Sequence, residues 1–135
     1  MMLSAIDNSP TRNYSRARII GYWAVTALIA FELVYGALWD FNVLNQGYVY
    51  TVLKHLGYPL YLAGMLGACK LAAAVVILTP GLPRLKEWAY AGVVILFAGA
   101  WVSHLAVGDA PGQFIWSLLF AVLTGLSWRL RLQHR

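Results

Sequence analysis

Four long apolar stretches, separated by short polar or proline-containing segments, make up most of this chain. They cover approximately residues 19–39, 58–79, 88–107 and 113–130. About 20 apolar residues of helix are needed to cross the roughly 30 Å hydrocarbon core of a bilayer. Each stretch is close to that length, so we predict an all-α fold, an integral membrane bundle of four transmembrane helices. Residues 16–135 would form this single domain, preceded by a polar N-terminal tail over residues 1–15.

The residue composition argues against the main alternatives to a membrane protein. Only 11% of the residues are charged and 61% are hydrophobic, whereas roughly a quarter of a soluble domain is charged. Such a chain has too little polar surface for a water-soluble globule and too many apolar side chains to remain disordered. Its one cysteine, Cys69, cannot build a disulfide scaffold.

The segments between the stretches support the same division. Pro80 and Pro83 follow the second stretch, and proline lacks the amide hydrogen that a helix interior requires. Residues 108–112 contain glycine, aspartate and proline and separate the third stretch from the fourth. The first connection, residues 40–57, is longer. Its apolar side chains recur at helical spacing, which predicts a short amphipathic helix in this outer loop.

The basic residues predict the orientation in the membrane. Eight of them fall on the side of the chain ends, whereas Lys54 falls on the other side and Lys70 lies inside the second stretch. The positive-inside rule then places both termini in the cytoplasm. Attraction to anionic lipid accounts for the net charge of +5, so the expected partner is the bilayer and not nucleic acid. The eight are Arg12, Arg16, Arg18, Arg84, Lys86, Arg129, Arg131 and Arg135.

Two charged side chains, Glu32 and Lys70, interrupt otherwise apolar stretches. A charge at the centre of a bilayer costs about 2.5–3.5 kcal/mol on insertion scales, so such residues are usually paired. At about 1.5 Å per residue, Lys70 lies about 8 Å deeper than Glu32, a gap that a lysine stem can bridge. We therefore predict a Glu32–Lys70 pair between the first two transmembrane helices. Ala63, Gly67 and Ala74 share the face of Lys70 and would let the helices approach closely.

The remaining polar residues gather at the outer ends of the stretches. His104 lies near the end of the third stretch, on a face that contains Gly92, Gly99, Ala100 and Ser103, and Asp109 follows it. His55 and Tyr58 lie at the same outer surface, whereas the inner half of each stretch reads as apolar. We predict an outward-facing pocket in which Glu32, Lys70, His104 and Asp109 carry the chemistry. Its ligand-binding residues would be Trp39, Asp40, Tyr61 and Trp116.

These residues also have structural interpretations, which the sequence leaves open. The Glu32–Lys70 pair would also serve to set helix register, and His104 would also serve as an interfacial histidine bonded to a carbonyl. No metal is predicted, because the chain has no Cys-x-x-Cys or His-x-x-x-His spacing. A single cysteine also precludes intrachain dithiol chemistry.

Three segments of the chain are unusual in sequence: Leu-Gly-Ala-Cys-Lys-Leu (66–71), Leu-Lys-Glu-Trp-Ala-Tyr-Ala-Gly (85–92) and Ser-His-Leu-Ala-Val-Gly-Asp (103–109). In these segments the chain resembles the DoxX-like family of small four-helix bacterial membrane proteins. The resemblance extends from about residue 22 to 128 and includes Glu32, Lys70, His104 and Asp109. It implies a four-helix bundle in the bacterial inner membrane and, through the wider DoxX group, a link to quinone oxidoreductases.

The leading functional hypothesis is therefore a pocket for a small amphipathic ligand in a quinone-linked oxidoreductase component. His104 would exchange a proton with the ligand while Glu32 keeps Lys70 charged, and a partner redox protein or a second copy of the chain would complete the assembly. Two alternatives remain: an accessory scaffold subunit whose Glu, Lys and His residues only order the bundle, and a small transporter. Whether the chain is an enzyme, and whether its cofactor is a quinone, stays open.

Overall fold

The part of the chain that the structure describes is all-α, as predicted. The computed structural model describes residues 11–44 and 47–132. Its four long helices are α1 (Thr11–Asp40), α3 (Leu62–Leu78), α4 (Pro83–Ala106) and α5 (Ile115–Leu132). A short helix, α2 (Tyr48–Leu56), lies where the amphipathic loop helix was predicted, and a 3-10 turn, η1 (Pro111–Phe114), precedes α5.

The helix bounds differ from the predicted ones mainly at the ends. The first helix begins at Thr11, within the predicted polar tail, of which residues 1–10 lie outside the described range. The second long helix begins at Leu62 and not at residue 58, because residues 57–61 form the turn that leaves α2. Among the described helices, Arg16–Asp40 and Pro83–Ala106 are long and apolar enough to cross a bilayer, while Leu62–Leu78 is apolar but shorter.

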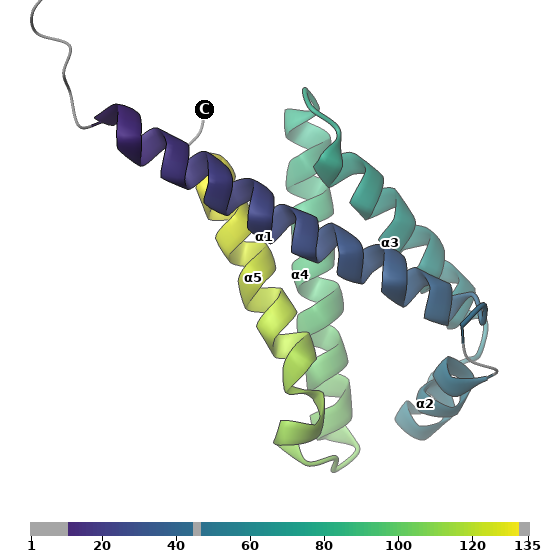
Figure 1. Cartoon of the computed structure of the whole chain (residues 1–135). Helices are drawn as coiled ribbons and strands as arrows, with labels where there is room; N and C mark the ends of the chain where they lie inside the picture. Colours follow the sequence, from purple (N-terminus) through teal and green to yellow (C-terminus); the bar gives the residue numbers. More distant parts are fainter. Residues whose placement is uncertain (1–10, 45–46, 133–135) are drawn as a thin grey trace, which may run out of the picture.

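Helix α1 crosses the molecule diagonally and packs against α3 on one side and α5 on the other, while α4 packs mainly against α5 (Figure 1). The start of α1, the turn between α3 and α4, and the end of α5 lie at one end, which we call the basic end. Helix α2 and the α4–η1 connection lie at the opposite, distal end. Helices α3 and α4 diverge from their shared turn toward the distal end. The described basic residues near the ends of the long helices therefore gather at the basic end, and Lys54 in α2 lies at the distal end, as the charge distribution predicted.

The core is formed by apolar side chains from all four long helices, including Ile29 and Leu33 of α1, Ile77 of α3 and Phe97 of α4. The predicted small-residue stripe on α3 is confirmed, because Ala63, Gly67 and Ala74 are all buried. Close approach is visible at Gly67, where an added Cβ atom would lie 2.9 Å from the Phe41 ring.

The predicted small-residue face of α4 is not a packing surface within the chain. Gly92 and Gly99 are exposed, and a Cβ atom at either position would contact nothing within 4 Å. The buried face of α4 instead carries mostly large side chains at helical spacing. These buried residues are Lys86, Tyr90, Val93, Phe97 and His104.

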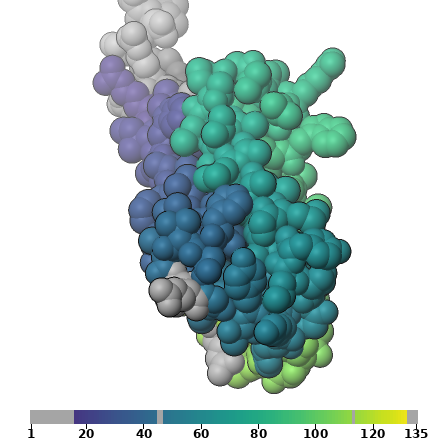
Figure 2. All heavy atoms as spheres, turned by 90° about the vertical axis from the view of Figure 1, so that its right-hand side faces the viewer, coloured from purple at the N-terminus to yellow at the C-terminus, as the bar shows by residue number. Residues whose placement is uncertain are grey.

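Helix α2 ends at Gly57 in a glycine C-cap, at the distal end of the molecule. Gly57 adopts a left-handed conformation (φ 83°) that a side chain would disfavour. This allows the amides of Gly57 and Tyr58 to donate to the carbonyls of Lys54 and Leu53, ending the helix in one turn. As a result α2 folds back across the ends of α1 and α3, and the three form one continuous face (Figure 2).

Candidate functional site

The charged residues at the α1–α3 interface form an ion pair, but with a different partner from the predicted one. The Nζ atom of Lys70 lies 2.7 Å from Oδ2 of Asp40, and the two side chains are only 15% and 6% exposed. The described residues contain no ion pair between Glu32 and Lys70. Glu32 lies close enough to interact electrostatically with the ammonium group. The predicted pair is therefore replaced by Asp40–Lys70, with Glu32 as a second nearby carboxylate.

The local sequence explains why Lys70 takes this path. Glu32, Gly36 and Asp40 are spaced by four residues and so share one face of α1. Gly36 has no side chain, and the lysine stem lies over it: a Cβ atom there would be 3.2 Å from Nζ and 3.6 Å from Cδ of Lys70. The glycine thus provides the space through which the stem reaches the end of α1. There the ammonium group faces a carboxylate beside the negative end of the helix dipole.

A groove of about 490 Å³ runs between α3 and α4, with Leu33 of α1 among the residues that line it. Among its described lining residues, Lys70 is the one charged side chain and Cys69 lies beside it; the others are apolar or glycine. Trp88, Gly92 and Leu96 line the α4 side. The groove exists because α3 and α4 separate below their turn, which leaves this side of α4 uncovered (Figure 1).

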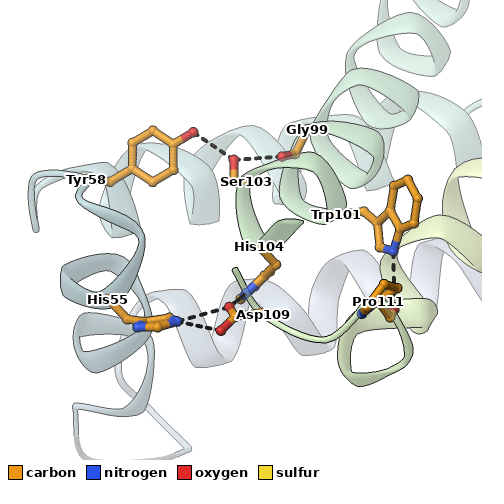
Figure 3. A network of polar contacts seen from close by, with 8 residues as sticks. All are labelled: His55, Tyr58, Gly99, Trp101, Ser103, His104, Asp109 and Pro111. Carbon is orange, nitrogen blue, oxygen red and sulfur yellow. Dashed lines mark hydrogen bonds and ion pairs between the residues drawn. The ribbon is translucent and has the colours of Figure 1, made fainter. Parts of the chain in front are cut away.

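His104 and Asp109 do come together, but with His55 and away from Lys70. Nδ1 of His104 lies 2.8 Å from one oxygen of Asp109, and Nε2 of His55 lies 2.8 and 3.0 Å from its two oxygens. Figure 3 shows both rings directed at the carboxylate from opposite sides. A carboxylate can only accept, so each of these nitrogens carries a hydrogen. These hydrogen bonds, from His104 first and then His55, hold the pKa of Asp109 below its ordinary value.

A second contact joins the turn after α2 to α4, next to the histidine cluster. The hydroxyl groups of Tyr58 and Ser103 lie 2.8 Å apart, and Ser103 also donates to the carbonyl of Gly99 (Figure 3). The structure thus places the predicted His104 and Asp109 in a cluster that anchors the α2 segment to the end of α4. His104 lines neither of the two grooves described for this molecule.

The predicted aromatic walls of the pocket are not assembled around Lys70. Tyr61 and Trp116 are 72% and 68% exposed. Trp39 instead joins a run of neighbouring rings along α1 and into α2, with centroids 6.0 Å from Tyr35 and 5.5 Å from Tyr48. The eight predicted site residues therefore do not form one pocket. Asp40 and Lys70 form an ion pair with Glu32 nearby, and His104 and Asp109 belong to the distal histidine cluster. Trp39 packs among neighbouring rings, and Tyr61 and Trp116 are exposed.

The sequence interpretation also missed a buried hydroxyl cluster nearer the basic end, in the half of the bundle expected to be apolar. The Ser127 hydroxyl lies 2.7 Å from that of Thr26 and 2.9 Å from that of Tyr90, which connects α1, α4 and α5. All three side chains are buried. Hydroxyl residues carry little penalty in hydropathy scales, so the usable signal was only that such residues occur within three otherwise apolar stretches.

A model of the DoxX-like family matches residues 24–127. The chain belongs to the DoxX-like family. The resemblance noted in the sequence is thereby confirmed, and the matched range of this DoxX-like protein contains the Asp40–Lys70 pair, the histidine cluster and the α3–α4 groove. Family membership and the two candidate spanning helices indicate a membrane protein. No curated protein matches the chain. No solved structure matches it either.

Proposed function

We propose that this DoxX-like protein binds a small amphipathic molecule of the quinone type in the α3–α4 groove, as a component of a quinone-linked oxidoreductase in the bacterial inner membrane. Four helices would span the membrane, with the basic end in the cytoplasm. The observation that carries the proposal is an apolar groove of about 490 Å³ in which Lys70 is the one charged lining residue described. Ligand sites are typically of this size and composition, with few polar groups that orient the ligand.

Lys70 suits the role of head-group donor. An ammonium group has three hydrogens, and the contact with Asp40 engages one of them. The others remain for a ligand carbonyl. The apolar lining would hold the hydrophobic part of the ligand and exclude water from the contact. A bound quinone would accept or supply the electron pair, and a partner redox protein would exchange it.

Cys69 offers a native reporter of groove occupancy, because it is exposed, lines the groove and is the one cysteine of the chain. Alkylation of this thiol by a maleimide would be timed in detergent, with and without a short-chain benzoquinone whose ring positions are all substituted. We expect the quinone to slow alkylation. In Lys70→Met the protecting concentration should rise about 10-fold or more, because one hydrogen bond to a charged group contributes about 1.5–3 kcal/mol.

Two glycines on α4 supply a matched pair for the same measurement. Gly92 lines the groove and Gly99 does not, yet a Cβ atom at either position would contact nothing within 4 Å. Gly92→Leu should abolish protection by filling the groove, whereas Gly99→Leu should leave it unchanged. Equal protection in all three variants and the wild type would disprove binding in this groove.

The scaffold hypothesis has its own support in the distal cluster. His104 and His55 share one carboxylate that anchors α2, which is an ordering role that needs no ligand. If Lys70→Met unfolds the protein and the wild-type thiol is never protected by quinone, the scaffold role is the better account. The small transporter is less well supported, because the described polar clusters are separate and are not joined by any hydrogen bond or ion pair found between them.

A further inference from the structure

A second groove, of about 350 Å³, lies between α4 and α5 on a different side of α4. Its floor is apolar and includes Ala91, Val94 and Gly125. Toward the basic end it is lined by Glu87, Tyr90 and Trp128. This groove has no part in the proposed quinone site, and its composition changes along its length from apolar to polar.

The polar end of this groove is constructed from both helices. One carboxylate oxygen of Glu87 accepts a hydrogen bond from the indole of Trp128 at 2.7 Å, and the other pairs with the guanidinium of Arg131. Arg131 also lies over the Tyr90 ring. The negative charge of Glu87 is thereby compensated within the protein. The sign of the electrostatic potential at the polar end of the groove is therefore determined by the other charged residues nearby.

Those residues are Arg84 and Arg129, which extend the two walls of the groove by about one turn. Arg84 precedes Glu87 by three residues and Ala91 by seven, and Arg129 follows Gly125 by four, so each lies on the helix face that borders the groove. Both arginines are exposed. Neither makes an ion pair within the part of the chain that the structure describes. Because α4 begins and α5 ends at the basic end, both residues lie just beyond the same end of the groove along their helices.

We propose that this groove binds one acyl chain of an anionic phospholipid, with Arg84 and Arg129 holding its phosphate. An apolar floor that ends near two guanidinium groups without an ion pair among the described residues matches an acyl chain that ends in a phosphate. Guanidinium groups bind phosphate through paired hydrogen bonds, and basic pockets between transmembrane helices are sites for anionic head groups. The excess of positive charge selects a lipid with net negative charge over a zwitterionic one.

The test uses the full-length protein in mild detergent and counts bound lipid by native mass spectrometry. Phosphatidylglycerol and phosphatidylcholine with the same acyl chains are added separately, and we expect selective retention of phosphatidylglycerol. In the double variant Arg84→Gln/Arg129→Gln its affinity should fall about 25-fold, about fivefold for each basic contact. The double variant Arg16→Gln/Arg18→Gln removes the same charge from α1 at the same end and should lose little.

Groove occupancy is tested separately at Gly125, where an added Cβ atom would contact nothing within 4 Å. Gly125→Leu should abolish selective retention by filling the groove, and Gly99→Leu should not. Equal loss in the Arg16/Arg18 variant would show general charge attraction and overturn the site. Undiminished retention in Gly125→Leu would also overturn it, as would a dimer that only Gly125→Leu disrupts, since the occupant would then be a second copy of the chain.

Discussion

Replacing Lys70 with methionine tests the most buried ionic contact between described helices α1 and α3. The substitution keeps most of the stem that lies over Gly36 and removes the ammonium group that lies 2.7 Å from Asp40. Asp40 then remains with a 6% exposed side chain and no cation beside it. Breaking a buried pair at one partner costs about 3–5 kcal/mol, chiefly because the other charge stays desolvated. We expect a loss near the lower bound, about 3 kcal/mol, because Lys70 is partly exposed.

The measurement is unfolding by SDS titration in mixed micelles at pH 7, followed by tryptophan fluorescence. Lys54→Met is the matched control, since it makes the same change at an exposed residue and should alter stability by less than about 0.5 kcal/mol. Adding Asp40→Asn to Lys70→Met should restore about 2 kcal/mol, because no unpaired charge remains. If Lys70→Met loses no more than the control, or if the two substitutions are merely additive, the ion pair does not stabilise the α1–α3 interface.

Three further predictions concern other contacts. Gly67→Ala should destabilise the protein by about 1–3 kcal/mol through a clash with an aromatic ring, whereas Gly64→Ala, where a Cβ atom contacts nothing, should be neutral or stabilising by up to about 1 kcal/mol in the same SDS titration. Asp109→Asn should speed hydrogen exchange of α2. In the wild type the lowered pKa of Asp109 means that its contribution to the stability of α2 is present at neutral pH and is lost only as the pH falls below about 3.9 and through the lower folded-state value. The protection factors of the α2 amides, which correct for the pH dependence of intrinsic exchange, should therefore fall only in that acidic range; an equal fall near pH 6 would contradict the assignment. Ser127→Ala removes a buried hydroxyl that bridges two others and should cost about 1–3 kcal/mol, with little effect on quinone protection of the groove thiol.

The stability and binding measurements together separate the two functional hypotheses. A variant that fills the α3–α4 groove without touching the core, such as Gly92→Leu, should lose ligand protection at unchanged stability. Lys70→Met should lose both. If the charged cluster is purely structural, Lys70→Met should still lose stability, whereas Gly92→Leu should cause no loss of ligand protection. The two variants therefore distinguish the hypotheses even if Lys70→Met folds poorly.

Parts of the candidate site could be predicted because they depend on spacing along one helix. The Ala63, Gly67 and Ala74 stripe follows from helical periodicity, and its burial is confirmed. The cost of burying a charge singled out Lys70 as a residue that needs a partner. The depths of the two residues along their helices then favoured Glu32 as the partner of Lys70, which was wrong. Rise per residue measures position along a helix but carries no information about the direction in which a lysine stem extends.

The sequence by itself determined the helical class, the separation into apolar helices, the short α2 helix and the concentration of basic residues at the basic end, because these depend on local periodicity, chain breaks and charge. Tertiary structure decided what those residues do. The crossing of α1 over α3 brings Gly36 beneath the Lys70 stem and Asp40 to its end. The return of α2 brings His55 to Asp109. The divergence of α3 from α4 opens a groove between them. Residue spacing cannot predict this groove, because it depends on the distance between two helices and not on the order of residues within either.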